Sequence, residues 1–251
     1  MCDDHTPAEF GTSIEPTGYH YRLSIEPLGR QSINNVKENV ASGLQMVRQL
    51  SDARIGDFHL FKTFQKHFLC QENDFPGLSQ AQNSVSQLLF GFDFKRSSVS
   101  VDSSFEVTVK SYFDPRLRCS LDKQLSIVKL KKCLEDLGPA WSQNNAWIQF
   151  YEHFTSSAKN SSPSDRLSPV LFSVDCSDSS TARIKIYSRV STFDLDVVSE
   201  HLALGGSPEK VRALRERLHK IWRTVLRLDS EDFSDEQISQ LCKVGQGCIT
   251  A

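Results

Sequence analysis

The sequence predicts a mixed α/β (α+β) protein in which pairs of antiparallel strands alternate with pairs of helices. Two observations lead to this prediction. Segments of alternating apolar and polar residues occur in three pairs, and each pair is followed by stretches with the apolar period of a helix. The strand–strand–helix–helix unit recurs about every 80 residues, which marks a repeated architecture rather than a repeated sequence.

The three expected strand pairs are joined by small, polar or glycine-containing segments, which are the usual hairpin signal. The pairs are 8–15 with 19–26, 88–95 with 104–113, and 169–175 with 182–189. Antiparallel pairs connected by helical hairpins can extend a single sheet. We therefore expect one sheet with all the helices on one of its faces.

Helical periodicity follows each pair of strands. The expected helical stripes are Ile33–Leu50, Phe58–Phe68, Ile127–Leu137, Trp147–Phe154 and Val211–Val225. Ser207 and Pro208 match a helix N-cap followed by a first-turn proline. Lys129, Lys131 and Lys132 are expected on a solvated helix face.

Alternation along the strands assigns two different faces to the sheet. One face is apolar and includes Tyr21, Leu23 and Ile25, so we expect helices to cover it. The other face carries cations and tyrosines, namely Arg22, Lys110, Tyr112, Arg183, Lys185 and Tyr187. The pattern alone fits either a solvated sheet face or the lining of a lumen in a curled sheet.

The residue types on that face suit one kind of chemistry. Cations at alternate positions of adjacent strands converge, which suits a diphosphate held by charge-assisted hydrogen bonds. A tyrosine ring stabilises a nearby cation by about 0.5–2 kcal/mol. Together they fit an allylic transfer, in which diphosphate leaves and a carbocation develops.

Composition excludes several other classes of protein. The 251 residues are 39% hydrophobic and 24% charged with a net charge of −2, which provides no global attraction for nucleic acid or an anionic membrane. We find no apolar run of about 18 residues and no secretory signal. The seven cysteines have no zinc-ligand spacing, so we expect reduced thiols in a cytoplasmic protein. Asp3–Asp4 and Asp194–Asp196 are expected in turns and helix starts rather than at a magnesium site.

Four segments in the same order resemble fungal aromatic prenyltransferases of the dimethylallyltryptophan synthase type. They are Thr6–Phe10, Tyr21–Pro27, Val109–Phe113 and Ala182–Tyr187. The resemblance implies a barrel of antiparallel strands inside a ring of helices. It also implies a soluble enzyme of alkaloid or other secondary metabolism that transfers a dimethylallyl or similar prenyl group. The donor would be an allyl diphosphate, and the acceptor an indole, a tryptophan derivative, a tyrosine or a phenolic polyketide.

The resemblance assigns roles to individual residues. Arg22, Lys110, Arg183 and Lys185 would bind diphosphate, Lys110 with a catalytic role, and Tyr112 and Tyr187 would shield the carbocation. Glu9 would be catalytic as well, accepting a hydrogen bond from the acceptor and assisting its deprotonation. No metal or other cofactor would be required.

The chain also departs from this family. Family barrels contain five strand–strand–helix–helix units, whereas this sequence contains three. We expect a partial barrel domain over 1–238 and an atypical tail over 239–251. Two alternatives follow from an open sheet: a truncated, inactive remnant that at most binds or dimerises, or a homodimer whose subunits complete the sheet.

Overall fold

The computed structural model describes residues 7–15, 18–29, 35–83, 86–96, 105–160, 167–192 and 194–225. The chain divides into two compact units. Unit 1 comprises Met1–Gly138 and Pro169–Tyr187, and unit 2 comprises Pro139–Ser168 and Ser188–Ala251. The predicted domain boundary at 238, the tail 239–251 and the pair Asp3–Asp4 lie outside the described residues.

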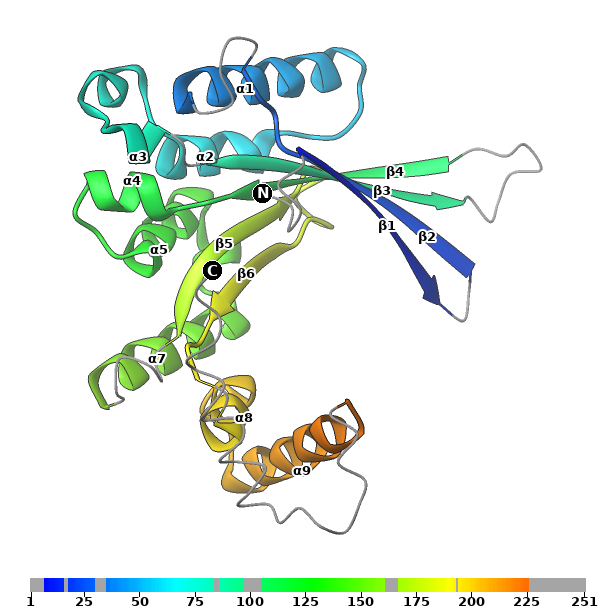
Figure 1. The fold of residues 1–251 in the computed structure, drawn as a ribbon, viewed down its shortest axis with the longest axis vertical. Coiled ribbons are helices and arrows are strands. Elements are labelled where there is room, and N and C mark those ends of the chain that lie inside the picture. The colour runs from blue at the N-terminus through cyan, green and yellow to red at the C-terminus, as the bar shows by residue number, and fades with distance from the viewer. Residues whose placement is uncertain are drawn as a thin grey trace. The chain divides into compact units, whose positions relative to one another are not determined.

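One six-stranded sheet forms the centre of unit 1 (Figure 1). Its strands lie side by side in chain order, and neighbours from the first to the fifth pair antiparallel. They are β1 (Ala8–Glu15), β2 (Gly18–Ile25), β3 (Leu88–Arg96), β4 (Phe105–Phe113), β5 (Ser168–Asp175) and β6 (Ile184–Arg189). All three predicted strand pairs are therefore confirmed, with boundaries shifted by no more than about two residues, as is usual for element ends.

Helices of unit 1 follow the first two strand pairs. They are α1 (Val36–Asp52), α2 (His59–Phe68), a 3-10 turn η1 (Glu72–Gly77), α3 (Gln80–Asn83), α4 (Arg116–Leu121) and α5 (Ser126–Leu137). The side chain of Asn35 caps α1 by accepting a hydrogen bond from the backbone N–H of Glu38 at 3.2 Å. The long helices were predicted, whereas η1, α3 and α4 are too short to show a helical period.

The aromatic stripe of α2 forms the core against the sheet. Phe61, Phe64 and Phe68 are fully buried. The ring centroid of Phe61 lies 5.3 Å from that of Phe113 on β4, and Phe68 lies 4.9 Å from Phe172 on β5. A buried phenylalanine contributes roughly 3–5 kcal/mol to stability, judged by truncation to alanine. The expected helical stripe Phe58–Phe68 is therefore confirmed, and its phenylalanines form part of the core.

Helix cover ends before the strands do, contrary to the expectation that helices cover the whole apolar face. Phe10 on β1 is 68% exposed and Tyr21 on β2 is 38% exposed. The two rings stack on each other with centroids 6.1 Å apart. Both residues belong to the β1–β2 hairpin, whose first strand is an edge strand of the sheet.

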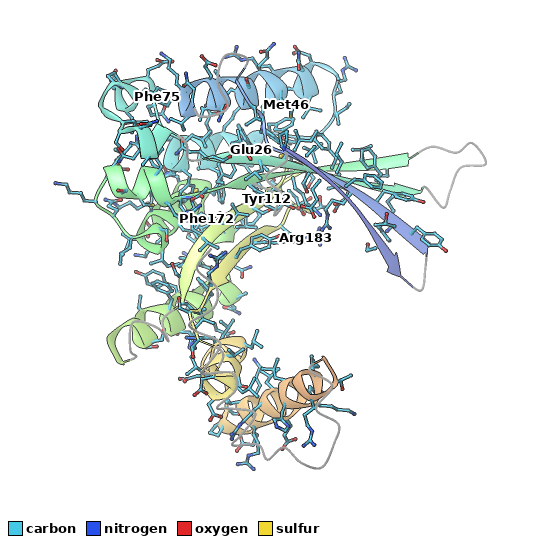
Figure 2. All side chains as sticks on the ribbon, viewed as in Figure 1. Glu26, Met46, Phe75, Tyr112, Phe172 and Arg183 are labelled. Carbon is cyan, nitrogen blue, oxygen red and sulfur yellow. The ribbon has the colours of Figure 1, made fainter. Side chains whose placement is uncertain are left out.

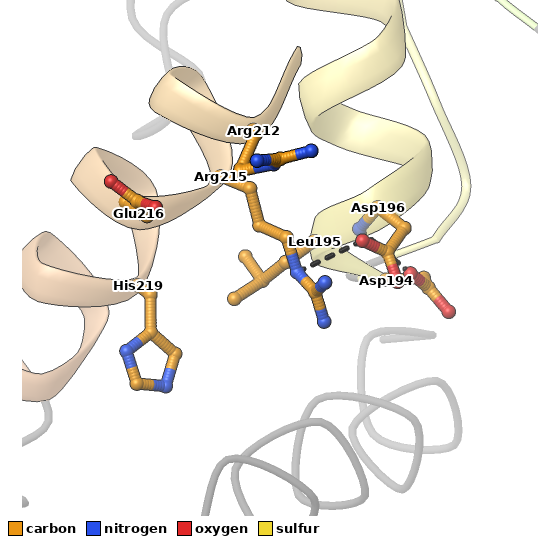
Figure 3. A pocket seen from close by; sticks show the side chains of 7 residues that line it. All are labelled: Asp194, Leu195, Asp196, Arg212, Arg215, Glu216 and His219. Carbon is orange, nitrogen blue, oxygen red and sulfur yellow. Dashed lines mark hydrogen bonds and ion pairs between the residues drawn. The ribbon is translucent and has the colours of Figure 1, made fainter. Parts of the chain in front are cut away.

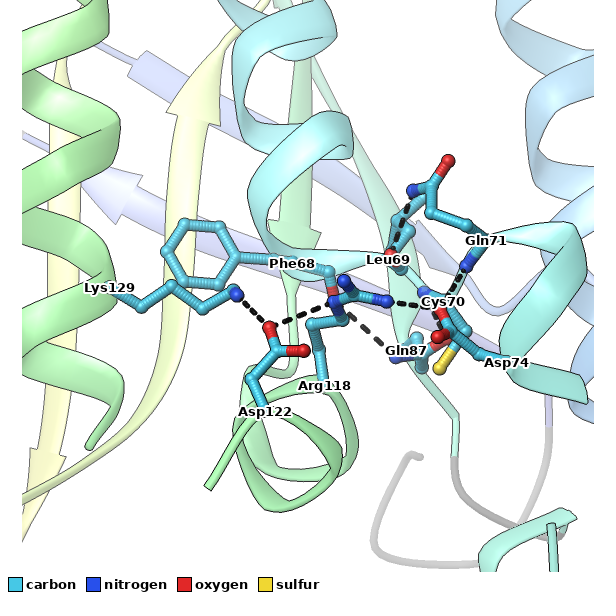
Figure 4. A network of polar contacts seen from close by, with 9 residues as sticks. All are labelled: Phe68, Leu69, Cys70, Gln71, Asp74, Gln87, Arg118, Asp122 and Lys129. Carbon is cyan, nitrogen blue, oxygen red and sulfur yellow. Dashed lines mark hydrogen bonds and ion pairs between the residues drawn. The ribbon is translucent and has the colours of Figure 1, made fainter. Parts of the chain in front are cut away.

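Lys129 is buried, so its assignment to a solvated helix face was wrong. Its ammonium group pairs with Asp122, which also accepts a hydrogen bond from Arg118 Nε at 3.1 Å (Figure 4). A second nitrogen of Arg118 pairs with Asp74. This network ties η1, α4 and α5 together beside the aromatic core. Lys131, by contrast, is half-exposed and pairs with Glu135 one turn later at 3.3 Å.

Unit 2 consists of helices. They are α6 (Pro139–Ser142), α7 (Asn145–Asn160), α8 (Leu195–Ala203) and α9 (Pro208–Val225). The Asp194 side chain caps α8 by accepting from the backbone N–H of Asp196 at 2.9 Å, as expected of a helix-start residue. His153 of α7 and His201 of α8 are buried and share a hydrogen bond of 2.9 Å. None of the described helices has the length and apolar character needed to cross a membrane.

Candidate functional site

The strand register places the predicted site residues on one face of the sheet. Opposite residues in antiparallel strands share a face, and Arg22 lies opposite Asp93, while Lys110 lies opposite Asp175. We call this the cationic face, and it carries Glu9, Arg22, Asp93, Lys110, Tyr112, Ser173, Asp175, Arg183, Lys185 and Tyr187. In Figure 2, Tyr112 and Arg183 lie across the strands from Met46 of α1. Residues from β1 to β6 are thus brought together although the chain separates them widely.

Asp93 links two of the predicted cations. Its Oδ1 accepts a hydrogen bond from Arg22 Nε at 2.7 Å, and its Oδ2 pairs with the ammonium group of Lys110. Lys110 is buried, with 3% exposure, whereas the side chain of Arg22 is 56% exposed. Burial acts to raise the pKa of Asp93, but the hydrogen bonds from Arg22 and Lys110 outweigh it and hold that pKa below its usual range. Asp93 is therefore an ionised bridge between β2 and β4.

Asp175 makes the corresponding contact at the other end of the site. Its Oδ2 accepts a hydrogen bond from Arg183 Nε at 2.8 Å, and the carboxylate is buried. The side chain of Arg183 is 62% exposed. The second oxygen of Asp175 and the hydroxyl of Ser173 are buried without a hydrogen-bond partner among the described residues.

Lys185 lies on edge strand β6, where the charges of both ion pairs act on it. Partial burial lowers its pKa, and the charges of Lys110 and Arg183 lower it further. No described residue forms an ion pair with its ammonium group. A cation crowded by other cations gains most from an incoming anion, so this arrangement favours a multiply charged ligand.

The two tyrosines meet over the same face. The ring centroids of Tyr112 and Tyr187 lie 6.1 Å apart. Burial raises the pKa of Tyr112 to about 12, with a further contribution from Tyr187, so its hydroxyl stays neutral near pH 7. Tyr112 lies across Gly91 of β3, where a Cβ atom would stand only 3.0 Å from its Cε2. A glycine in a strand interior often marks such a close approach.

Glu9 lies at the β1 edge of the cationic face. It is exposed and lines a small pocket of about 150 Å³ together with Arg22 and Ser24. The other lining residues are Gly11, Thr12 and Ser13. The structure thus brings Glu9 to the same hollow as one predicted diphosphate ligand.

Sequence reasoning missed the roles of Asp93, Asp175 and Gly91. Alternation along β3 puts Asp93 on the polar face, but its partners follow only from pairing β3 with β2 and β4. A sequence signal for Asp93 and Gly91 is the alternation along β3, which puts both residues on the same face. In the antiparallel pairing Gly91 lies opposite Lys110, and Asp93 lies opposite Arg22. Asp175, at the end of β5, required the same register.

Outside the cationic face, the described residues form a pocket in unit 2 and no metal site. A pocket of about 220 Å³ in unit 2 is lined by Leu195 and charged residues of α8 and α9, with Arg215 Nε 2.9 Å from Asp196 Oδ1 (Figure 3). Across the part of the chain that the structure describes, no group of three or more His, Cys, Asp or Glu side chains is placed to hold a metal ion.

A family comparison covers nearly the whole chain. The model of the family described as tryptophan dimethylallyltransferase matches residues 1–248. The 4-O-dimethylallyl-L-tyrosine synthase of Claviceps purpurea is 25% identical over 237 residues, which are 88% of this chain and 48% of that protein. The 7-dimethylallyltryptophan synthase of Aspergillus fumigatus is 28% identical over 255 residues, covering 92% of this chain and 49% of its own. This chain thus spans about half the length of the curated relatives it matches.

Solved structures share the fold. NotF in complex with brevianamide F and DMSPP matches with a TM-score of 0.69 and 20% identity, over 92% of this chain and 57% of that one. AnaPT from Neosartorya fischeri matches with a TM-score of 0.63 and 18% identity, over 86% and 53%. The predicted fold class is confirmed, with the curled antiparallel sheet forming a half-barrel.

Proposed function

Because the chain belongs to the tryptophan dimethylallyltransferase family, we propose that it transfers a dimethylallyl or similar prenyl group from an allyl diphosphate to an aromatic acceptor. One observation carries the proposal at the level of residues. Arg22, Lys110, Arg183 and Lys185 gather on a single face of the sheet, with two tyrosines beside them. This is the arrangement that an anionic leaving group and a developing carbocation require.

The cations would stabilise the leaving group. In the proposed reaction the allylic C–O bond breaks, and diphosphate leaves with the electron pair. Arg22 and Arg183 have exposed side chains, and the charges of both act on Lys185 of β6. Lys110 forms the floor of the site, since its ammonium group is buried and paired with Asp93. Neutralisation by protein cations makes a metal ion unnecessary, and turnover in excess EDTA tests this point.

The tyrosines and Glu9 would act on the organic partners. The faces of Tyr112 and Tyr187 stabilise the allyl cation by about 0.5–2 kcal/mol each and limit its contact with water. A bond then forms between the allyl carbon and the acceptor, which releases a proton. Glu9, as an exposed carboxylate in the pocket beside Arg22, is the group that we assign to hold the acceptor and assist the loss of that proton.

Indole and phenol acceptors would both suit a carboxylate such as Glu9. The Claviceps purpurea relative is named for transfer to tyrosine and the Aspergillus fumigatus relative for transfer to tryptophan. A carboxylate such as Glu9 accepts a hydrogen bond from an indole N–H or from a phenol O–H equally well. We therefore propose tryptophan- or indole-derived and phenolic acceptors, including phenolic polyketides, in alkaloid or other secondary metabolism.

We further propose that this protein forms a homodimer and is located in the cytoplasm. β1 lies at one edge of the sheet and β6 at the other, so a second copy could add strands at either edge. A homodimer formed in this way would enclose the cationic face further, and sedimentation equilibrium tests it. Cys70, Cys119, Cys133 and Cys176 are buried and unpaired, which favours a reducing, cytoplasmic compartment.

A product assay tests the function. Dimethylallyl diphosphate is incubated with tryptophan or tyrosine and the full chain, and prenylated product is measured by mass spectrometry. Lys185→Ala should lower the rate by about 100-fold or more, because it removes a contact to the leaving group. Lys131→Ala, an exposed lysine of α5, is the matched control and should keep the wild-type rate.

The alternative to prenyl transfer is that this protein is a non-catalytic remnant that only binds. Among the described residues no strand pairs with the outer side of β1 or β6, and this favours the remnant, because water that enters the site would quench an allyl cation. Pyrophosphate binding without any prenylated product would support the remnant. Failure to bind pyrophosphate would contradict both functions.

A further inference from the structure

The two arginines of the cationic face are held in the same way. Arg22 and Arg183 lie on different strand pairs, and each donates its Nε–H to an aspartate, at 2.7 Å to Asp93 and 2.8 Å to Asp175. A guanidinium carries five N–H donors, of which Nε supplies one. No further hydrogen bond or ion pair within the described part of the chain engages the four terminal N–H donors of either arginine.

Exposure differs between the two ends of each pair. The side chains of Asp93 and Asp175 are 24% and 4% exposed, whereas those of Arg22 and Arg183 are 56% and 62% exposed. The carboxylates therefore hold the inner edge of each guanidinium against the sheet. The outer edges, with their terminal N–H groups, remain accessible over the cationic face.

We propose that Asp93 and Asp175 are positioning residues, which fix the guanidinium groups of Arg22 and Arg183 so that their terminal N–H groups converge on the diphosphate of the donor. The proposal rests on the proposed function. Arginine side chains lose considerable rotamer freedom when they bind a ligand, and a side chain that is already held loses less. The two carboxylates also offset half of the positive charge of the four proposed diphosphate ligands, because these four cations with Asp93 and Asp175 sum to a net charge of +2.

This role makes a prediction opposite to that of simple electrostatics. Replacing Asp93 or Asp175 by asparagine raises the net charge of the site by one unit, which by itself would strengthen the binding of an anion. If the carboxylates position the arginines, the same replacement weakens binding. Immobilising one side chain on binding corresponds to a loss of about two- to tenfold in affinity.

Calorimetric titration of the full chain with inorganic pyrophosphate distinguishes positioning by the carboxylates from simple electrostatic attraction. We expect Asp93→Asn and Asp175→Asn each to weaken binding by about two- to tenfold. Asp178→Asn is the matched control, since Asp178 lies in the β5–β6 turn and accepts hydrogen bonds from Ser180 instead of an arginine. The control should bind like wild type or slightly more tightly. Equal or tighter binding by the Asp93 and Asp175 variants would overturn the positioning role.

A spectroscopic experiment tests the positioning role independently of the proposed function. In wild type, the Nε–H signals of Arg22 and Arg183 in ¹⁵N correlation spectra should be shifted and protected from exchange, and each should lose protection in the asparagine variant of its own aspartate. Unchanged signals would overturn the positioning role even if pyrophosphate binds. Absence of pyrophosphate binding by wild type would overturn the proposed function, whatever the spectra show.

A second variant covers the case in which Asp93→Asn does not fold, because it leaves buried Lys110 without its partner. Arg22→Lys keeps the charge but removes the Nε–H that Asp93 holds. It should weaken pyrophosphate binding about as much as Asp93→Asn. Wild-type affinity in Arg22→Lys would contradict the proposal.

Discussion

The ring of Tyr112 lies so close to Gly91 that a Cβ atom on Gly91 would stand 3.0 Å from Cε2 and 3.3 Å from the hydroxyl oxygen of the tyrosine. Gly91 is buried in β3, directly opposite Lys110. The absence of a side chain at this position therefore sets how deeply Tyr112 sits on the cationic face.

We expect Gly91→Ala to lower the free energy of unfolding by about 1–3 kcal/mol, because the added methyl group overpacks the site. Urea denaturation measures the effect. The matched control is Gly11→Ala on the same face, where a Cβ atom meets nothing within 4 Å. In a double-mutant cycle, Tyr112→Ala should cancel most of the loss. Equal effects of Gly91→Ala with and without Tyr112 would show that the ring does not need this space.

Pyrophosphate affinity should fall as pH rises through the pKa of Lys185. Burial, Lys110 and Arg183 place that pKa below the usual lysine value of about 10.4. The ligand requires the charged form, so binding weakens at a lower pH than an ordinary lysine would allow. Calorimetry between pH 7 and pH 10.5 measures this. In Lys185→Arg, whose guanidinium stays charged, the alkaline loss should largely disappear, and an unchanged profile would contradict the assignment.

Neighbouring lysines of α5 should differ in their contribution to stability. Lys129→Met removes one of the two cationic partners of Asp122, and we expect a loss of about 2 kcal/mol, as for a hydrogen bond to a charged group. Lys131→Met removes only a half-exposed pair with Glu135, which is worth less than about 0.5 kcal/mol. Chemical denaturation of the two variants makes the comparison, and equal losses would contradict the buried network.

Acidification should loosen unit 2 through its histidine pair. Burial lowers the pKa of His153, and the neighbouring His201 lowers it further. The unfolded chain therefore takes up a proton first, below about pH 6.5, and the stabilisation present above that pH is lost as pH falls. Amide exchange in α7 and α8 at pH 7.5 and pH 5.5 measures the effect. His153→Gln should show a smaller difference between the two pH values, and no difference in wild type would contradict the assignment.

Much of this architecture could be predicted from local sequence. Alternation fixed the six strands and the face on which Arg22, Lys110 and Lys185 lie, because the period of a strand is a local property. The helical stripe Phe58–Phe68 was likewise predicted, and its phenylalanines are buried.

Predictions failed where the outcome depends on a neighbour that is distant in the chain. Lys129 has the sequence context of a solvated lysine, and only the packing of α4 against α5 gives it Asp122 as a partner. Tyr21 was expected on a helix-covered face, but it lies on β2, next to edge strand β1, and is 38% exposed. Asp93 and Asp175 acquired a role only when the strand register set them beside Arg22 and Arg183.

The order of the strands has a consequence for how this protein can be assembled. Each strand lies beside the strands that precede and follow it in the chain, from β1 to β6. A cut between two hairpins would therefore divide the sheet along a single seam and leave both halves with intact pairs. We expect fragments divided between β4 and β5 to reassociate when they are expressed together, so that the sheet behaves as a modular surface that can be split and rejoined.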